Sequence, residues 1–294
     1  MKTSIDTMVL QAKLTNEQMD SVFDYIHHGY YNDKRYRYNL HIADYGFNIH
    51  LLPHNPLWKF NAKITLQTNF FTQKYVPHSL IDILHLLDWS VTSIDIAFDF
   101  HTAIEDSIAF THHGNVKVNQ LTDENGHSST YTGAFNPKRK NNQSIHYDRN
   151  QKEISLNFES GGYNHVLSNR YEVRLSFKMD ELPLHNIDHH LIMKQLKKYI
   201  FISSIAKMDT EGKTKRKFRK IAEAPEKLNG YYKDKRSMLK KIAKMHREPL
   251  EVYYEIAKND NLYDFLKIKP YPATVYDFRA LEHNEELLYN QKIS

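Results

Sequence analysis

Alternating apolar and polar positions dominate the first two-thirds of the chain and predict a sheet. Successive side chains of a strand point to opposite faces, so alternation over about 4–8 residues indicates a strand with one buried face. Turn residues at 44–46 and 123–126 separate neighbouring strands, as expected for hairpins. The pattern predicts strands at 4–13, 58–68, 91–100, 116–121, 128–135, 143–149 and 170–177, with two more inside 35–52.

Apolar residues that recur every three or four positions predict helices. Thr15 can cap a helix over 16–27, and Pro77 opens another that reaches about Leu87. The pattern turns helical after Pro183, with helices expected at 187–206, 225–247, 251–258 and 280–290 and linkers at 211–220 and 268–272. We therefore expect an α+β fold: a mainly antiparallel sheet with flanking helices in residues 1–182, followed by a basic helical region in residues 183–294.

Composition excludes several kinds of chemistry. The 294-residue chain has no cysteine, which excludes disulfides, a thiol nucleophile and cysteine-ligated metals. A Walker-type phosphate loop and a G-x-G-x-x-G motif are both missing, so an ATPase or a dinucleotide enzyme is not expected. No apolar run approaches the roughly 18 residues of a membrane span, and the first ten residues lack the apolar core of a signal peptide. We expect a cytoplasmic protein with no membrane partner.

Charge is distributed unevenly along the chain. The net charge of +5 combines −4 in residues 1–193, +13 in 194–247 and −4 in 248–294; the middle segment has 18 basic and 5 acidic residues. Binding a polyanion would relieve the self-repulsion of that segment and release counterions. The alternative is a solvated helical surface. We predict DNA binding by the densest run, which contains Lys213, Lys215, Arg216, Lys217, Arg219 and Lys220.

Two aspartates lie on an otherwise apolar strand. By alternation Asp95 and Asp99 share one face, and Glu172 of the 170–177 strand can join them. Aspartate is uncommon in strands and like charges on one face repel, so a cation is expected there; oxygen ligands favour Mg²⁺ or Mn²⁺. If repulsion prevails, replacing either aspartate leaves folding nearly intact. The alternative is a set of cross-strand ion pairs with basic residues.

Three arginines and a tyrosine complete the candidate catalytic set. Arg170 and Arg174 share the polar face of the 170–177 strand and can hold phosphates. Arg149 follows Tyr147, whose phenolate can attack a phosphodiester beside a metal and form a phosphotyrosine bond. Tyrosine by itself is not specific, since the chain has 20. The basic loop that precedes this strand either contacts phosphates or is an exposed hairpin tip; it contains Lys138, Arg139 and Lys140.

These segments, in this order, resemble the rolling-circle replication initiators of small staphylococcal and related Gram-positive plasmids, the trans-acting Rep family. The resemblance covers about residues 4–177 as motifs and the remainder only in its basic, helical character. The matching motifs are the strand 94–100, Tyr131-Thr-Gly133, Tyr147-Asp-Arg149 and Arg170-Tyr-Glu172.

The resemblance implies a nicking and joining enzyme. Tyr147 would cut one strand of double-stranded plasmid origin DNA and remain on the 5′ phosphate, with acidic metal ligands in place of a histidine pair. The C-terminal part would recognise the origin, and the protein would act as a dimer with a host helicase. Ile145 stands where the family usually has arginine, and His146 is polar where the family is apolar, so Tyr131 is an alternative nucleophile.

Other functions share many of these features. A mobilisation relaxase or a filamentous-phage initiator would have most of the motifs, and a metal-dependent hydrolytic nuclease needs no covalent step. A non-catalytic origin-binding initiator or repressor needs only the basic region. A nicking enzyme requires Asp95, Asp99, Glu172 and Tyr147 together on one sheet face in an open groove. A scattered set, or a tightly covered face, favours the non-catalytic protein.

Overall fold

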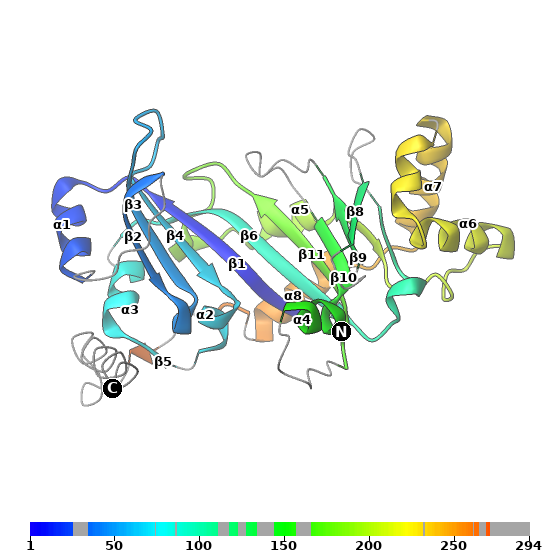
Figure 1. The fold of residues 1–294 in the computed structure, drawn as a ribbon, viewed down its shortest axis with the longest axis horizontal. Helices are drawn as coiled ribbons and strands as arrows, with labels where there is room; N and C mark the ends of the chain where they lie inside the picture. Colours follow the sequence, from blue (N-terminus) through cyan, green and yellow to red (C-terminus); the bar gives the residue numbers. More distant parts are fainter. Residues whose placement is uncertain are drawn as a thin grey trace, which may run out of the picture. The chain divides into compact units, whose positions relative to one another are not determined.

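The chain has an α+β fold built on a large antiparallel sheet of nine strands (Figure 1). The strand order is β2-β3-β4-β1-β6-β11-β10-β9-β8. No helix within the described part of the chain is long and apolar enough to cross a membrane. The computed structural model describes residues 1–25, 35–73, 75–85, 87–110, 118–122, 128–133, 144–156, 166–231, 233–260, 262–264 and 269–270.

Two compact units share the chain. One unit, called unit 1 below, combines residues 1–6, 93–176 and 188–262, and unit 2 combines 7–92, 177–187 and residues after 262. Strands β1 (Lys2–Ala12) and β6 (Ser90–Phe100) each contribute residues to both units. The segment 188–262 therefore folds together with 93–176, a grouping that differs from a single cut near residue 182. The predicted functional division into 1–182 and 183–294 stays a prediction.

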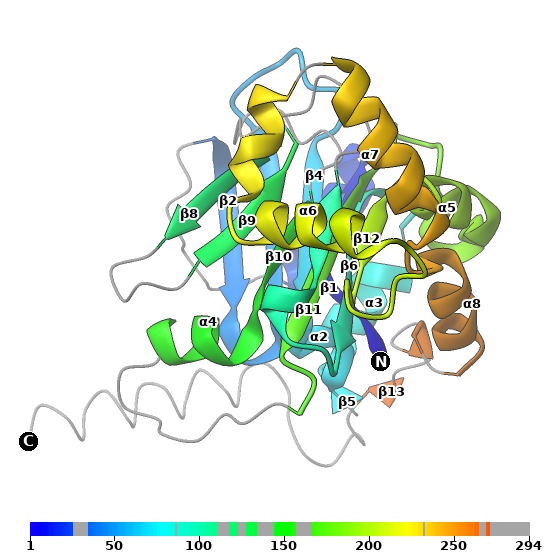
Figure 2. The same cartoon turned by 90° about the vertical axis from the view of Figure 1, so that its right-hand side faces the viewer.

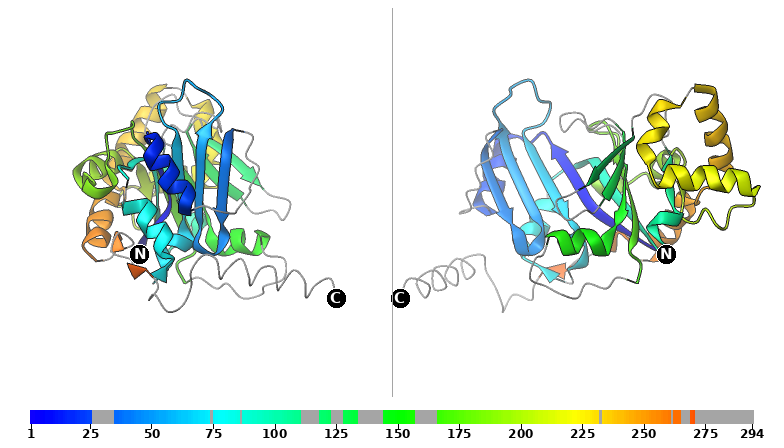
Figure 3. Two further views of the ribbon diagram at one scale, coloured as in Figure 1. Left: turned by 90° about the vertical axis from the view of Figure 1, so that its left-hand side faces the viewer. Right: turned by 45° about the vertical axis from the view of Figure 1, so that its right-hand side comes forward.

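Unit 2 contains the first half of the sheet and two helices on one face of it. Helices α1 and α3 cover the strands on the same side, as Figure 3 shows. Met19 and Val22 of α1 and Leu80, Ile83 and Leu84 of α3 are buried, as the helical spacing predicts. Its elements, besides β1, are α1 (Asn16–Tyr25), β2 (Tyr36–Ile42), η1 (Ala43–Tyr45), β3 (Phe47–Pro53), β4 (Ala62–Gln67), α2 (Thr68–Thr72), β5 (Tyr75–Val76), α3 (His78–His85), η3 (Leu184–Asn186) and β13 (Lys269–Pro270).

Gly46 forms the turn between β2 and β3. Its φ is +59°, a left-handed conformation that favours glycine, and a Cβ at this position would lie 3.1–3.3 Å from atoms of Gln67, Asn69 and Phe70. Both the backbone angle and the space therefore require glycine here. This confirms the turn predicted at 44–46.

Unit 1 contains the other half of the sheet and the basic helices. Apolar residues of α6 and α7 pack with those of β7 and β12 in one core, to which Phe110, Phe218, Ile221 and Leu239 belong; Figure 2 views this side. Its elements, besides β6, are η2 (Ile104–Asp106), β7 (Ile108–Phe110), β8 (Val118–Thr122), β9 (Ser128–Thr132), β10 (Ser144–Asp148), α4 (Arg149–Leu156), β11 (Asn169–Ser176), α5 (His189–Leu196), β12 (Ile200–Ile202), α6 (Gly212–Ala222), η4 (Pro225–Gly230), α7 (Lys233–Met245) and α8 (Leu250–Asp260).

Three predictions for the C-terminal part are wrong. The single helix expected at 225–247 is divided into the 3-10 helix η4 and helix α7, with Tyr231 in an extended conformation between them. The helix expected at 187–206 ends at Leu196, and the β-branched run that follows forms β12, which pairs with β7. The linker expected at 211–220 is helix α6, because Phe218 and Ile221 lie one turn apart and are both buried. The predicted helix at 280–290 and the turn at 123–126 lie outside the described residues.

Candidate functional site

Three neighbouring strands bring most of the predicted catalytic residues onto one face of the sheet. Strand β11 lies between β6 and β10, and Arg170 pairs in register with Asp99 on one side and Tyr147 on the other. Arg174 pairs with Asp95, and Glu172 lies between the two arginines on the same face. The register therefore confirms the alternation predicted for these strands.

Each aspartate is held by an arginine of β11. Arg170 donates to both carboxylate oxygens of Asp99, from Nε at 2.6 Å and Nη2 at 3.0 Å. Arg174 also donates from two nitrogens to Asp95: Nε lies 2.7 and 2.9 Å from the two carboxylate oxygens, and Nη2 donates to Oδ2. Such bidentate pairs are strong and directional. This is the cross-strand ion-pair arrangement, the alternative interpretation of the aspartates.

Tyr147 and Glu172 form a hydrogen-bonded pair beside Arg170. The Tyr147 hydroxyl donates to Glu172 Oε1, and Arg170 Nη1 lies 3.6 Å from the same oxygen. Burial raises the pKa of Glu172, and the nearby charge of Asp6 raises it further. Burial also raises the pKa of Tyr147, with the charge of Glu172 as the next cause. Glu172 is thus a stronger proton acceptor than an exposed glutamate, and it already contacts the phenol proton.

Two residues of this cluster were not identified as site residues from the sequence. Asp6 of β1 lies 3.5 Å from Arg170 Nη1, and Lys152 of α4 lies over the Tyr147 ring with its ammonium 3.9 Å from the ring centre. Asp6, like Asp95 and Asp99, is an aspartate within a strand. The criterion that identified those two residues from the sequence could therefore have identified Asp6 as well. Lys152 could not be found from the sequence, because its position depends on the turn from β10 into α4.

The predicted catalytic residues lie together on this face, but most of their side chains are buried. Tyr147 is 4% exposed, Asp99 1% and Glu172 8%. Arg149, whose Nη1 lies 3.6 Å from Asp99, and Arg174 are more accessible, with side chains 24% and 33% exposed. One requirement of a nicking enzyme is therefore met and the other, an open groove, is not met in this conformation.

The carboxylates do not fit a metal site as they are arranged. The described residues contain no group of three or more acidic or histidine side chains placed to hold a metal ion. Both oxygens of Asp99 and of Asp95 accept hydrogen bonds from arginine, so their charge is already compensated. Mg²⁺ or Mn²⁺ therefore stays a prediction from the sequence, and no chemical step below is assigned to it.

The other candidate tyrosines differ from Tyr147 in their surroundings. Tyr131 pairs with Ile145 across β9 and β10 and is only half-buried; burial raises its pKa, and the charge of Glu172 adds to this. Tyr171 faces the opposite side, fully buried, and stacks on Phe201 with ring centres 4.5 Å apart. Tyr131 therefore remains an alternative nucleophile on the same face, and Tyr171 lies on the core side, as alternation predicts.

The predicted DNA-binding run forms one helix. The charged residues of α6 lie away from its buried side, formed by Phe218 and Ile221, and most are exposed. Lys215 is half-buried, with its ammonium donating to the carbonyl of Ala206 at 2.9 Å. Lys138, Arg139 and Lys140 lie outside the described residues. The exposed cations are Lys213, Arg216, Lys217, Arg219 and Lys220.

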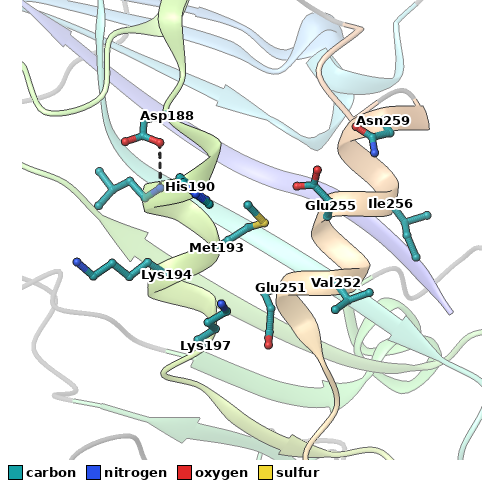
Figure 4. Close-up of a pocket in the computed structure, with 11 residues that line it drawn as sticks. Asp188, His190, Met193, Lys194, Lys197, Glu251, Val252, Glu255, Ile256 and Asn259 are labelled. Atoms are coloured by element: carbon teal, nitrogen blue, oxygen red, sulfur yellow. Dashed lines mark hydrogen bonds between the residues drawn. The ribbon is translucent and has the colours of Figure 1, made fainter.

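A groove of about 620 Å³ lies between α5 and α8 of unit 1 (Figure 4). Lys194 and Lys197 project from α5, and Glu251 and Glu255 from α8. The rest of its lining is mixed: Asp188, His190 and Asn259 are polar, and the apolar residues include the half-exposed Val252. None of the predicted catalytic residues lines it.

Comparison with known proteins finds similarity among solved structures but not among sequences. No protein-family model matches the chain, and no curated protein sequence matches it. A solved structure of a rolling circle replication initiator protein from Geobacillus stearothermophilus is similar, with a TM-score of 0.41 and 13% identity, over 75% of this chain and 96% of that one. Likeness at this level does not define a function, so the function is argued below from the residues of this chain.

Proposed function

We propose that this protein is a plasmid replication initiator that binds the origin and nicks and rejoins one DNA strand through a phosphotyrosine at Tyr147. The observation that carries the proposal is the contact of the Tyr147 hydroxyl with Glu172 beside Arg170. A buried tyrosine, a carboxylate with a raised pKa and a guanidinium are the parts that phosphoryl transfer to a phenol needs. The net charge of +13 in residues 194–247 supports DNA as the substrate.

The chemistry follows from these contacts. Glu172 accepts the phenol proton while Tyr147 Oη bonds to the scissile phosphorus, and the bond from phosphorus to the 3′ oxygen breaks. A water molecule passes the proton from Glu172 to the leaving 3′ oxygen, and Arg170 and Arg149 stabilise the charge that develops on the phosphate. The reverse attack by a 3′ hydroxyl rejoins the strand and returns the proton to Tyr147. Energy of the original phosphodiester is conserved in the phosphotyrosine.

DNA has to uncover the tyrosine before this reaction. Lys152 covers the Tyr147 ring from α4, and a phosphate near Arg149 and Lys152 offers both cations a new partner. Binding of the origin therefore moves Lys152 off the ring and admits the scissile phosphate. The reaction is then coupled to DNA binding, because the free protein keeps its nucleophile buried.

Adduct formation on supercoiled plasmid tests the proposal. Plasmids that carry candidate origins are incubated with wild-type protein, Tyr147→Phe and the matched control Tyr131→Phe, in Mg²⁺, in Mn²⁺ and in EDTA. We expect covalent adducts and nicked circles with wild type and Tyr131→Phe, and neither with Tyr147→Phe. Adduct retained in Tyr147→Phe would falsify the assignment of the nucleophile. The EDTA arm tests the predicted metal independently.

A second candidate is a non-catalytic origin-binding initiator or repressor. The near-complete burial of Tyr147 and its raised pKa favour it, since a neutral, covered phenol is a poor nucleophile. This protein would bind origin DNA tightly and give no adduct under any of the conditions above. A mobilisation relaxase would give the adduct at a transfer origin instead. The host helicase and the homodimer stay predictions for either protein that initiates replication.

A further inference from the structure

A polar cavity of about 280 Å³ lies on the side of the sheet opposite to Tyr147. Buried residues of β9 and β10, Thr130 and His146, line it, and Figure 2 views the strands and the helix α6 that surround it. Four exposed side chains from separate elements also line it: Glu105, Gln120, Gln151 and Glu223. The volume is just below the roughly 300–1,000 Å³ of pockets that take drug-sized ligands, so a smaller ligand fits.

His146 gives this cavity a neutral ring. Its Nε2 lies 2.9 Å from Asn169 Oδ1 and 3.0 Å from Ser107 Oγ. Ser107 donates its own proton to the carbonyl of Ile104, so Nε2 carries hydrogen and Nδ1 is the ring atom that can accept. Burial lowers the pKa of His146 to about 4. At neutral pH the ring is therefore an uncharged acceptor.

The charges around the cavity select against phosphate. None of the described residues that line it is lysine or arginine, whereas Glu105 and Glu223 are both acidic. The carboxylates and the neutral imidazole accept hydrogen bonds, whereas the amides and hydroxyls of the lining can both donate and accept. The charged part of the lining therefore favours a ligand that carries hydrogen-bond donors. Apolar side chains complete the cavity and suit the faces of a flat ring; they include Ile104, Ile108 and Pro225.

The position of the cavity connects it to nucleic acid. Its wall includes Ala222, the last residue of the basic helix α6, and Gln151 of α4. The same α4 carries Arg149, which lies 3.6 Å from Asp99 on the Tyr147 face. A strand whose phosphates bind near the C-terminal end of α6 would pass the wall that Ala222 and Glu223 form, while the acidic lining itself disfavours phosphate. Glutamate accepts from the amino group of cytosine and glutamine pairs with adenine, which are the common ways of recognising these bases.

We propose that this cavity binds one unstacked, amino-bearing nucleobase, adenine or cytosine, of a single-stranded segment of the origin. The proposal rests on the proposed function in that it takes DNA as the substrate. According to this proposal, the cavity distinguishes DNA sequences near the nick. The exposed cations of α6 bind phosphates whatever the sequence is. Base extrusion into a pocket costs least in DNA that is already single-stranded.

Equilibrium binding of short single strands to the full chain tests this. Strands with a central adenine or cytosine are compared with the same strand carrying thymine, and with one in which purine replaces adenine and so lacks only the amino group. We expect tighter binding of the adenine or cytosine strand by about tenfold over both references, the scale of one good base contact. Equal affinity for all four strands overturns the proposal.

A matched pair of variants locates the discrimination. Glu223→Ala and Glu226→Ala each remove one exposed carboxylate from neighbouring positions, but only Glu223 lines the cavity. Both should raise affinity for every strand slightly by charge alone. Only Glu223→Ala should reduce the preference for the amino-bearing base, and an equal change in both variants places the discrimination elsewhere and overturns the proposal.

The two proposals fail in different ways. If the protein binds the amino-bearing strand selectively but forms no covalent adduct on plasmid DNA, the base pocket is supported and the nicking function is refuted. If an adduct forms at Tyr147 but binding shows no base selectivity, the base pocket is refuted and the nicking function is supported. Loss of binding to all DNA removes both.

Discussion

Ion pairing determines how the residues around Tyr147 respond to substitution. Asp99 neutralises Arg170, a guanidinium whose side chain is only 7% exposed. Breaking a buried pair costs up to about 3–5 kcal/mol, and here Asp6 and Glu172, both within 3.6 Å of Arg170, would compensate part of the freed charge. The expectation that an aspartate can be removed with folding nearly intact stays untested, and the Asp99–Arg170 pair argues against it because attraction to arginine opposes the repulsion between the two aspartates.

We predict that Asp99→Ala lowers the free energy of unfolding by up to about 3–5 kcal/mol. Asp95→Ala is the matched control, since its partner Arg174 is 33% exposed and water can solvate the freed charge. Its loss should be about 1 kcal/mol or less. Denaturant unfolding of both variants measures the difference, and equal losses would contradict this account of the buried pair.

Glu172 should control the rate of adduct formation. Its carboxylate must be ionised to accept the phenol proton, and burial raises its pKa, so the rate should increase as pH rises through that raised pKa. Glu172→Gln keeps the shape and loses the base, and we predict a reduction of about 10²–10⁴-fold in adduct formation. DNA affinity should stay the same. An unchanged rate in Glu172→Gln would assign proton transfer to another group.

His146 makes stability depend on pH in the acid range. Its pKa is about 4 in the folded protein and 6.5 in its ordinary state, so the unfolded chain binds more protons between these values. The stabilisation is complete above pH 6.5 and is lost as pH falls towards 4, by at most about 3 kcal/mol. His146→Gln should flatten this part of the stability profile. The exposed His101→Gln is the control, and the same profile in both variants would contradict the prediction.

Period-two alternation was enough to predict which residues of each strand share a face, but not that these faces meet around Tyr147. Asp95, Asp99, Arg170, Glu172 and Arg174 all fall where the pattern places them. Alternation does not show which side chains of different strands form ion pairs. Those pairs depend on which strands are neighbours in the sheet, and neighbouring strands can be far apart in the sequence. The arginine–aspartate pairs and the participation of Asp6 needed the structure for this reason.

Among the helices and strands, α6 is expected to contribute to DNA affinity and not to the reaction at Tyr147. The described contacts of Tyr147 are with Glu172 and Lys152 and include no cation of α6, so charge changes in α6 should alter binding and not the proposed reaction. The helix was predicted as a linker because its charges dominate the sequence and only Phe218 and Ile221 mark a buried side. A short buried stripe of two residues is too small a periodic signal against six basic neighbours.

We predict that replacing Lys213, Arg216, Lys217 and Lys220 with glutamine reduces the salt dependence of DNA binding. The slope of log affinity against log salt should fall by about 0.9 for each phosphate that the variant no longer neutralises, or roughly 3–4 in total. A control variant changes four exposed cations of unit 2, Lys13, Arg37, Lys59 and Lys178, and should leave the slope nearly unchanged. Equal effects of the two variants would mean that net charge, and not α6, determines binding.

Unit 1 as a whole depends on segments that are remote in sequence. Phe201 of β12 stacks on Tyr171 and contacts Phe100, with ring centres 4.5 and 5.1 Å apart. Local patterns predict strands and helices but not which of them share a core, so this grouping could not be predicted from the sequence. The α+β class and most strands could be, because they depend on local periodicity.

We predict that a fragment of residues 1–182 does not unfold cooperatively. It lacks Phe201 and the other C-terminal residues of the unit 1 core, so Tyr171 and Phe100 lose their aromatic partners. Near-ultraviolet circular dichroism should show loss of fixed aromatic packing, with much of the far-ultraviolet signal retained. A sharp unfolding transition in the fragment, matching that of the full chain, would show that 1–182 folds independently.

The division of β1 between the two units has a consequence for the newly made protein. Residues 7–12 find their partner β4 soon after translation begins, whereas unit 1, to which Asp6 belongs, is complete only when residue 262 has been added. At about 5–20 residues per second, the interval between residues 92 and 262 lasts roughly 10–30 s on the ribosome. A nascent chain therefore lacks a complete unit 1 for most of its synthesis. Under the proposed function, it would gain nicking activity only after residue 262 has been added, and a prematurely terminated chain would have none.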